Sequence, residues 1–351
     1  MPLVTRHSSL VTAPAGRHGV LLGAWGHFGE VLDEMDASGG DLGLAGIAAV
    51  REEDGDVPAA QLVAAHPCAA SARICDNADA LLRDLRPDFA IVSARLDRIP
   101  RLAALAASHG CHIVTEKPLA TDFDSLRSLQ EAVLTAGVRV CAMLPNRARP
   151  PLAAAISAIR AGTIGRPRLL NARKTYKWGA SRPAWFGDRA AYGGTIPWIG
   201  IHALDFIDAA TDGDPVVDVS AFHANLAHKT MPGCEDVCVL AMRLQSGALA
   251  TATLDYLRPD APVPHGDDGL RVVGEHGELT VDIERNHAVL LEPGAAPRDL
   301  PLPEPALYYA PWLLALPQHG SKAEPDDRTL RAFRLTDEAL RARDAADQRM
   351  R

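Results

Sequence analysis

The sequence lacks the features that would place the protein in a membrane or on nucleic acid. No apolar run is long enough to cross a bilayer, and polar residues interrupt positions 1–19, where a signal peptide needs a continuous apolar stretch. A formal charge of −8, without a basic stripe, disfavours a partner with a phosphate backbone. We therefore expect a cytoplasmic protein that binds neither membrane nor nucleic acid.

Cysteines are few and form no recognisable pattern. The six are scattered, and the one close pair, Cys234 and Cys238, has no second pair at metal-site spacing. Free thiols in a reducing compartment are the expected state. The sequence predicts no bound metal.

What the chain does contain is the composition of a folded enzyme. Hydrophobic residues make up 47% of its 351 residues and charged residues 23%, as in ordinary globular domains. This length suits two domains better than one core. Two domains can hold a ligand in the cleft between them.

The first half alternates short apolar runs with amphipathic stretches, which is typical of repeated βαβ units. We expect a doubly wound parallel sheet with helical crossovers. Between the first two runs, Phe28, Val31, Leu32 and Met35 recur at helical spacing. The predicted strands are 20–23, 47–50, 89–93, 111–115 and 139–143.

The second half changes pattern after Asn146. One helix ending at Gly162 is followed mainly by strand-like runs. Two antiparallel hairpins are predicted, and a last helix begins near Asp326 or Asp327. We therefore expect an α+β domain with a large, mostly antiparallel open sheet. The hairpin strands are 237–244 with 249–254, and 270–273 with 279–281.

A glycine-rich turn follows the first predicted strand. Residues 23–29 read Gly-Ala-Trp-Gly-His-Phe-Gly, which matches the dinucleotide-binding pattern G-x-G-x-x-G except that Ala24 replaces the first glycine. Gly26 would let backbone amides approach a pyrophosphate at the helix N-terminus, and Gly29 would let helix and strand pack closely. The residues expected to bind the cofactor here are Ala24, Gly26, His27, Phe28 and Gly29.

The end of the second predicted strand bears on the choice of cofactor. If Arg51 meets the adenosine ribose, its guanidinium suits the 2'-phosphate of NADP; if Glu52 does, NAD is preferred. A solvated charged turn is the alternative. We predict NAD or NADP, with NADP preferred, and expect Ser93, at the end of the third predicted strand, to face the cofactor as well.

Three segments together resemble the glucose-fructose oxidoreductase, inositol dehydrogenase and MocA (Gfo/Idh/MocA) family. They are the glycine turn, the sequence Glu-Lys-Pro-Leu-Ala at 116–120, and the stretch from Gly193 to Asp205. The resemblance implies a homodimer or homotetramer in which an N-terminal Rossmann domain precedes a domain for substrate binding and oligomerisation. It places an N-terminal extension at 1–18, the Rossmann domain at 19–145 and the second domain at 146–351.

Lys117 is the first predicted catalytic residue. It follows the strand predicted at 111–115, and the carboxyl ends of such strands face the ligand crevice. The resemblance implies that Lys117 hydrogen-bonds the reacting oxygen of the substrate, and Glu116 and Pro118 are expected to line the cofactor beside it. The alternative is a lysine in an exposed turn.

His202 is the second predicted catalytic residue, 85 positions beyond Lys117. The resemblance implies a histidine here with an aspartate four residues earlier, but this chain has Trp198 in that place, and an indole takes up no proton at neutral pH. His202 must therefore act alone or with another group. A packed, hydrogen-bonded helix histidine is the alternative.

Residues 176–198 are dense in aromatic side chains, which suggests a pocket wall against which sugar or cyclitol rings pack. Lys174, Lys177 and Arg182 could bind hydroxyls or an acidic substituent. A core or a subunit interface is the alternative. The residues expected in the substrate pocket are Tyr176, Trp185, Tyr192, Trp198 and Asp205.

These patterns predict an NAD(P)-dependent oxidoreductase that acts on a hydroxyl or carbonyl of a sugar, cyclitol or related small polar molecule. Two alternatives stay open. A redox-neutral enzyme could oxidise and re-reduce the same sugar, as glycoside-cleaving family members do, and a catalytically silent sensor could bind nucleotide and a partner protein. The tryptophan at position 198 is the best support for the sensor.

Overall fold

The computed structural model describes residues 16–179 and 182–349. Its N-terminal half is a six-stranded sheet in the order β3-β2-β1-β4-β5-β6. All of its neighbouring strands run parallel. This confirms the predicted doubly wound fold, because the order reverses between β1 and β4. The strands are β1 (Arg17–Leu22), β2 (Leu42–Ala48), β3 (Arg73–Cys75), β4 (Phe89–Val92), β5 (His112–Thr115) and β6 (Val140–Ala142).

Helices cover both faces of this sheet, because its strands are apolar on both sides. In β1, Leu21 belongs to one hydrophobic core, while Val20 and Leu22 belong to the other. The helix α5 begins where the Asp122 carboxylate accepts from the Ser125 amide at 2.8 Å. The helices are α1 (Phe28–Ala37), α2 (Ala59–Ala65), α3 (Ala78–Leu85), α4 (Ile99–Ser108) and α5 (Phe123–Ala136).

The C-terminal half is an eight-stranded sheet in the order β14-β13-β12-β11-β7-β10-β9-β8. Among the described strands of this sheet only β7 and β10 pair in parallel, so the mostly antiparallel sheet and both predicted hairpins are confirmed. The strands are β7 (Pro167–Lys177), β8 (Val216–Ala224), β9 (Val237–Leu244), β10 (Leu249–Arg258), β11 (Gly269–Gly274), β12 (Glu278–Asp282), β13 (His287–Leu291) and β14 (Arg298–Asp299).

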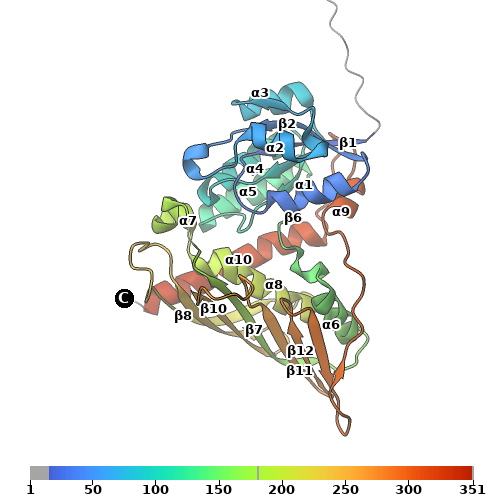
Figure 1. The fold of residues 1–351 in the computed structure, drawn as a ribbon, viewed down its shortest axis with the longest axis vertical. Coiled ribbons are helices and arrows are strands. Elements are labelled where there is room, and N and C mark those ends of the chain that lie inside the picture. Colours follow the sequence, from blue (N-terminus) through green and yellow to red (C-terminus); the bar gives the residue numbers. More distant parts are fainter. Residues whose placement is uncertain (1–15, 180–181, 350–351) are drawn as a thin grey trace, which may run out of the picture.

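Of the remaining helices, α8 and α10 lie between the two sheets, α9 lies beside α1 of the N-terminal half, and α6 packs against the C-terminal sheet (Figure 1). They are α6 (Pro150–Arg160), α7 (Arg189–Tyr192), α8 (Ile201–Ala210), α9 (Ala310–Leu314) and α10 (Asp327–Arg349). A π-helical turn, Ile196–Gly200, leads directly into α8. Shorter 3-10 turns are Glu52–Asp54, Pro67–Ala69, Leu96–Arg98, Pro145–Ala148 and Ala184–Gly187.

Segments near the C-terminal end of the chain pack against α1 and β6 of the N-terminal half. On α1, the Glu34 carboxylate accepts from the amides of Tyr308, Tyr309 and Ala310, and so holds the start of α9. On α10, the Thr329 hydroxyl accepts from the amide of Val140 in β6 at 2.9 Å. The two halves are therefore joined along their length, and we keep the division near residue 145 as a proposal.

Two further observations concern the chain as a whole. Most of the predicted N-terminal extension lies outside the described residues, but Arg17 and His18 already belong to β1. Among the described residues, no helix is both long enough and apolar enough to span a membrane.

Candidate active site

The glycine turn after β1 lies at the carboxyl edge of the parallel sheet, beside the residues that follow β4 and β5. Gly23 and Gly26 have φ of 77° and 103°, a backbone conformation that favours glycine. A Cβ on Gly26 would stand 2.2 Å from Oε2 of Glu116. Glycine at position 26 thus lets the segment that carries Glu116 and Lys117 lie directly against the turn, and the Lys117–Pro118 peptide bond there is cis.

Several amides of the turn are bound by side chains of neighbouring loops. The Ala24 amide donates to Asp56 at 3.0 Å, and the His27 amide donates to Glu116 at 2.7 Å. His27 Nδ1 lies 2.8 Å from the same Glu116 oxygen. The Ser93 hydroxyl donates to the carbonyl of Trp25 at 2.5 Å, so Ser93 stabilises the backbone of the turn. The sequence did not single out Asp56, since only the fold brings it back to Ala24.

The start of α1 remains open to a ligand. Its N-terminus has no side-chain cap, and the amides of Phe28 and Gly29 have no hydrogen-bond acceptor among the described residues. A Cβ on Gly29 would meet nothing within 4 Å. Free amides at a helix N-terminus attract anions, so these residues fit the pyrophosphate of a dinucleotide.

Arg51 and Glu52, the residues expected near the adenosine ribose, have exposed side chains. The strand β2 ends at Ala48, two residues earlier than predicted, and Arg51 follows it in the loop. The Arg51 side chain is 56% exposed and pairs with Glu53 at 3.3 Å. Glu52 begins the adjacent 3-10 turn and is also exposed. Both Arg51 and Glu52 are therefore available at the surface.

Lys117 is buried, with 1% of its surface exposed. Its Nζ donates to the carbonyl oxygen of Trp198 at 3.0 Å and lies 3.3 Å from the centroid of the Trp198 ring. Burial lowers the pKa of Lys117 to about 7, although the charge of Glu116 opposes this change. Charged and neutral forms of Lys117 are therefore both populated near neutral pH.

Trp198 belongs to an aromatic cluster that joins the two halves of the molecule. We use this name for Trp25, Trp185, Phe186 and Trp198. The Trp25 ring, from the glycine turn, lies 4.7 Å from Trp185 and 5.2 Å from Trp198, and Trp185 Nε1 donates to the carbonyl of Asp54 at 2.9 Å. Trp185 and Trp198 therefore line the contact between the two halves. No pattern in the sequence indicated that Trp25 belongs to this cluster.

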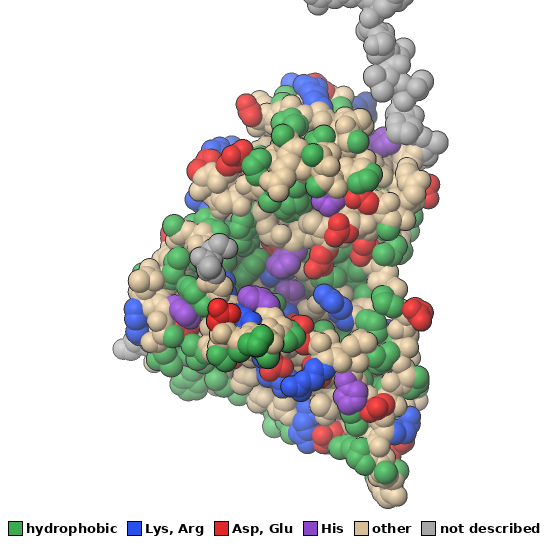
Figure 2. Space-filling model, viewed as in Figure 1, with side chains coloured by type: hydrophobic (Ala, Val, Ile, Leu, Met, Phe, Trp, Pro, Cys, Tyr) green, Lys and Arg blue, Asp and Glu red, His purple; other side chains and the backbone are tan. Residues whose placement is uncertain are grey.

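His202, on α8, faces a cavity of about 210 Å³ between α1 and β7. It is 5% exposed, and its Nδ1 has no hydrogen-bond partner among the described residues. Burial, followed by the charges of Lys117 and Lys174, lowers its pKa well below the usual value, so the imidazole is neutral. In the space-filling view, histidine side chains gather in the hollow between the two halves (Figure 2). The lining residues are His27, Glu30, Met143, Pro145, Asn146, Arg149, Lys174, Tyr176, His202, His265, Gly266, Asp268, Ile283 and Glu284.

Of the five residues predicted in the substrate pocket, only Tyr176 lines the cavity of His202. Trp185 and Trp198 belong to the aromatic cluster, and Asp205 and Tyr192 lie elsewhere. Asp205 is fully buried, and its carboxylate accepts from Nε of Arg147 at 3.1 and 3.3 Å. Tyr192 is also fully buried, and its hydroxyl lies 3.1 Å from the hydroxyls of both Thr195 and Tyr256. The structure brings Tyr176 to the cavity of His202, but neither of these two residues lines it.

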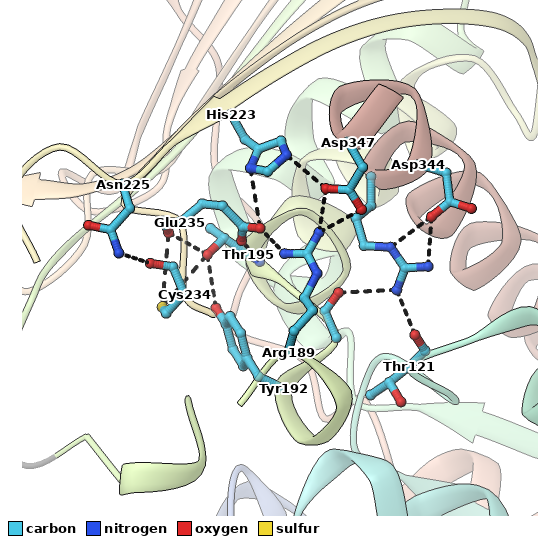
Figure 3. A network of polar contacts seen from close by, with 12 residues as sticks. Thr121, Arg189, Tyr192, Thr195, His223, Asn225, Cys234, Glu235, Asp344 and Asp347 are labelled. Carbon is cyan, nitrogen blue, oxygen red and sulfur yellow. Dashed lines mark hydrogen bonds and ion pairs between the residues drawn. The ribbon is translucent and has the colours of Figure 1, made fainter. Parts of the chain in front are cut away.

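A polar network anchors the segment that leads to Trp198 (Figure 3). The Glu235 carboxylate accepts from the Thr195 amide at 2.9 Å. His223, Glu235 and Asp347 place possible metal-ligand atoms within 4.8 Å of one another. However, Arg189 forms ion pairs with both carboxylates, so a guanidinium already balances their charge. This network positions the π-helical turn and needs no metal to do so.

Family models match two ranges of the chain. Residues 20–143 match an oxidoreductase family with an NAD-binding Rossmann fold, and residues 152–280 match the Gfo/Idh/MocA C-terminal domain. The two ranges cover most of the N-terminal sheet, the cleft and much of the C-terminal sheet. Both halves of the site therefore fall within matched sequence.

Similar proteins include one curated sequence and several solved structures. The 1,5-anhydro-D-fructose reductase of Ensifer adhaerens is 30% identical over 219 residues, which is 58% of this chain and 63% of that protein. An oxidoreductase structure from Thermotoga maritima has a TM-score of 0.82 at 26% identity and covers 94% of this chain and 98% of its own. The WlbA dehydrogenase of Bordetella pertussis, in complex with NADH and UDP-GlcNAcA, has a TM-score of 0.73 at 22% identity and covers 95% and 97%.

Proposed function

Since this chain belongs to the Gfo/Idh/MocA family of NAD-binding oxidoreductases, we propose that it transfers hydride between a nicotinamide coenzyme and a hydroxyl or carbonyl of a sugar, cyclitol or related small polar molecule. One observation carries the proposal. Buried Lys117, from the N-terminal half, donates at 3.0 Å to the carbonyl of Trp198, which lies in the turn that leads into α8 and four residues before buried His202 of the C-terminal half. The curated relative, a reductase of an anhydrosugar, supports a sugar-type substrate.

In this proposal the coenzyme, when bound, supplies or takes up the hydride. The free amides of Phe28 and Gly29 hold its pyrophosphate. Lys117 donates a hydrogen bond to the substrate oxygen and stabilises negative charge on it. Lys117 also exchanges the proton of that oxygen, and the neutral imidazole of His202, whose Nδ1 is unpartnered, hydrogen-bonds the same hydroxyl. The aromatic cluster excludes water from the cleft.

Trp198 stands where the resemblance implies an aspartate, and we propose that it orients Lys117 by other means. Its carbonyl oxygen accepts one N–H of the lysine, and its ring contacts the ammonium group as a cation–π partner. The two remaining N–H groups of the ammonium are left for the substrate, and the Glu116 carboxylate lies 4.0 Å away as a charge partner. Lys117 thus keeps a fixed direction without an acidic partner on α8.

The pKa of Lys117 predicts how carbonyl reduction depends on pH. The charged form donates the proton and stabilises the alkoxide, and it predominates below its pKa of about 7. We expect kcat for reduction to be level well below pH 7 and to fall about tenfold per pH unit above it. The Lys117→Arg variant stays charged at these pH values, so its profile should lack this alkaline limb. The same limb in both profiles would assign it to another group.

We propose that the coenzyme is NADP rather than NAD, because the exposed guanidinium of Arg51 suits a 2'-phosphate. In fluorescence titrations, Arg51→Ala should raise the Kd of NADPH by about tenfold and leave that of NADH nearly unchanged. Arg127→Ala removes a comparably exposed arginine of α5 and serves as the control. Unchanged affinities for both coenzymes in Arg51→Ala would remove the argument for NADP.

We also propose that the chain forms a homodimer or homotetramer through the outer face of the C-terminal sheet. Phe222 and Val239 are neighbours on this face and are 57% and 47% exposed, and Leu249 of β10 is 54% exposed. An apolar patch of this kind is typical of a subunit interface. Light scattering should report an oligomer for the parent and a smaller species for Val239→Lys. A monomeric parent would refute this assembly.

A further inference from the structure

The cavity at His202 has more carboxylates than cations in its lining. Glu30, Asp268 and Glu284 face two permanently charged groups, Lys174 and Arg149. Lys174 is 2% exposed, and its ammonium group donates to Asp268. Arg149 is exposed at the rim of the cavity. Burial raises the pKa of Glu284, and the charge of Arg149 opposes this change by a smaller amount. Lys174 is thus already paired with a carboxylate, and Arg149 lies at the exposed rim rather than inside the cavity.

The other basic residues of the predicted pocket wall are occupied as well. Lys177 donates to the carbonyl of Ala261. The Arg182 guanidinium lies 3.8 Å from the centroid of the Tyr256 ring and donates to the carbonyl of Lys177. Neither residue lines the cavity. The sequence-based expectation that this wall binds an acidic substituent therefore finds no free cation to support it.

Two buried polar atoms of the cavity lining lack partners. Asp268 is 3% exposed, and its Oδ1 accepts no hydrogen bond among the described residues. His202 Nδ1 also has no hydrogen-bond partner among the described residues. A carboxylate only accepts hydrogen bonds, and a buried acceptor without a donor is costly. A ligand that brings O–H or N–H donors to this lining would supply partners for these two atoms.

We propose that this cavity binds an uncharged single-ring polyol, whose hydroxyls donate to Asp268 and Glu284, and that it discriminates against rings that carry a carboxylate or phosphate. The inference rests on the proposed function, because it takes the cavity as the substrate site. The volume of about 210 Å³ lies below the roughly 300 Å³ at which pockets for drug-sized ligands begin, which matches one ring. Like charges brought together without water between them weaken binding.

The test compares rings that differ only in charge. Glucose and galactose are paired with glucuronate and galacturonate, and kcat/KM is measured for each with the preferred coenzyme. The neutral ring of each pair should be favoured about 100-fold. In Glu284→Gln this ratio should fall toward unity, because a negative charge at the rim is removed, and Asp268→Asn should lower kcat/KM for the neutral rings. Glu304→Gln, an exposed carboxylate away from the cavity, should leave the ratio unchanged.

Three outcomes separate this inference from the proposed function. Equal or better use of the uronates overturns the inference but leaves the oxidoreductase standing. Failure of NADH and NADPH to bind in the fluorescence titration removes the proposed function. If neither ring of a pair is turned over, the rise in the Tm of the protein is measured with each ring at equal concentration. A larger rise with the neutral ring than with the uronate supports the inference, and no rise with the neutral ring overturns it.

Discussion

Replacing Lys117 with alanine is expected to lower kcat by about 10²- to 10⁴-fold, the usual contribution of a general acid, while the Kd of the reduced coenzyme changes by no more than a few-fold. The reason is positional. The Lys117 ammonium is buried against the carbonyl and ring of Trp198, at the meeting point of the two halves. The proposed pyrophosphate amides belong to α1 instead. Stopped-flow absorbance and fluorescence titration measure the two quantities on the same preparation.

The control for this prediction is Lys322→Ala, which removes an exposed lysine from the segment before α10. That variant should match the parent in both measurements. If Lys117→Ala lowered coenzyme affinity as much as kcat, Lys117 would be a coenzyme ligand and its assignment as proton donor would be wrong.

Replacing Arg147 with methionine is expected to lower the free energy of unfolding by about 3–5 kcal/mol, because it leaves a buried carboxylate without its main partner. Asp205 has no exposed surface, and the Arg147 guanidinium also pairs with Asp208 at 2.8 Å. The nearest other cation, on Arg331, lies 3.7 Å from Asp205. Urea denaturation followed by circular dichroism measures the loss.

A second substitution separates a structural role of Asp205 from a catalytic one. In Arg147→Met/Asp205→Asn the buried charge is gone, so part of the lost stability should return. The folded single variant should keep most of its kcat, since among the described residues the Arg147 side chain bonds only to Asp205 and Asp208, and neither Arg147 nor Asp205 lines the cavity at His202. A large fall in kcat at unchanged stability would indicate that Asp205 belongs to the substrate site.

Much of the fold could be predicted because it depends on local patterns. The strands β1, β4, β5 and β6 are buried runs, and buried parallel strands are apolar on both faces. The hairpins were visible from alternating residues on either side of short polar turns. The strand β3 was missed, because it has only three residues and Ile74, in its centre, is 53% exposed.

The sequence predicted a site residue only where the order of strands in the fold determines the place of that residue. Lys117 follows a buried parallel strand, so topology alone directs it to the crevice. Asp56, by contrast, reaches the Ala24 amide through the folding of a loop, and no local spacing records that contact. The helix α8 is buried on every side, so the sequence could not show that His202 faces the cavity while Asp205 faces Arg147.

The central claim is that Lys117 and His202 act on a small sugar-type substrate beside a bound nicotinamide. Absorbance of the reduced nicotinamide band, followed while the enzyme and oxidised coenzyme are mixed with neutral pyranoses and cyclitols, tests it most directly. The account predicts net formation of reduced coenzyme with at least one of these rings, and its loss in the Lys117→Ala and His202→Ala variants. Coenzyme that binds but shows no net change with any ring would contradict it.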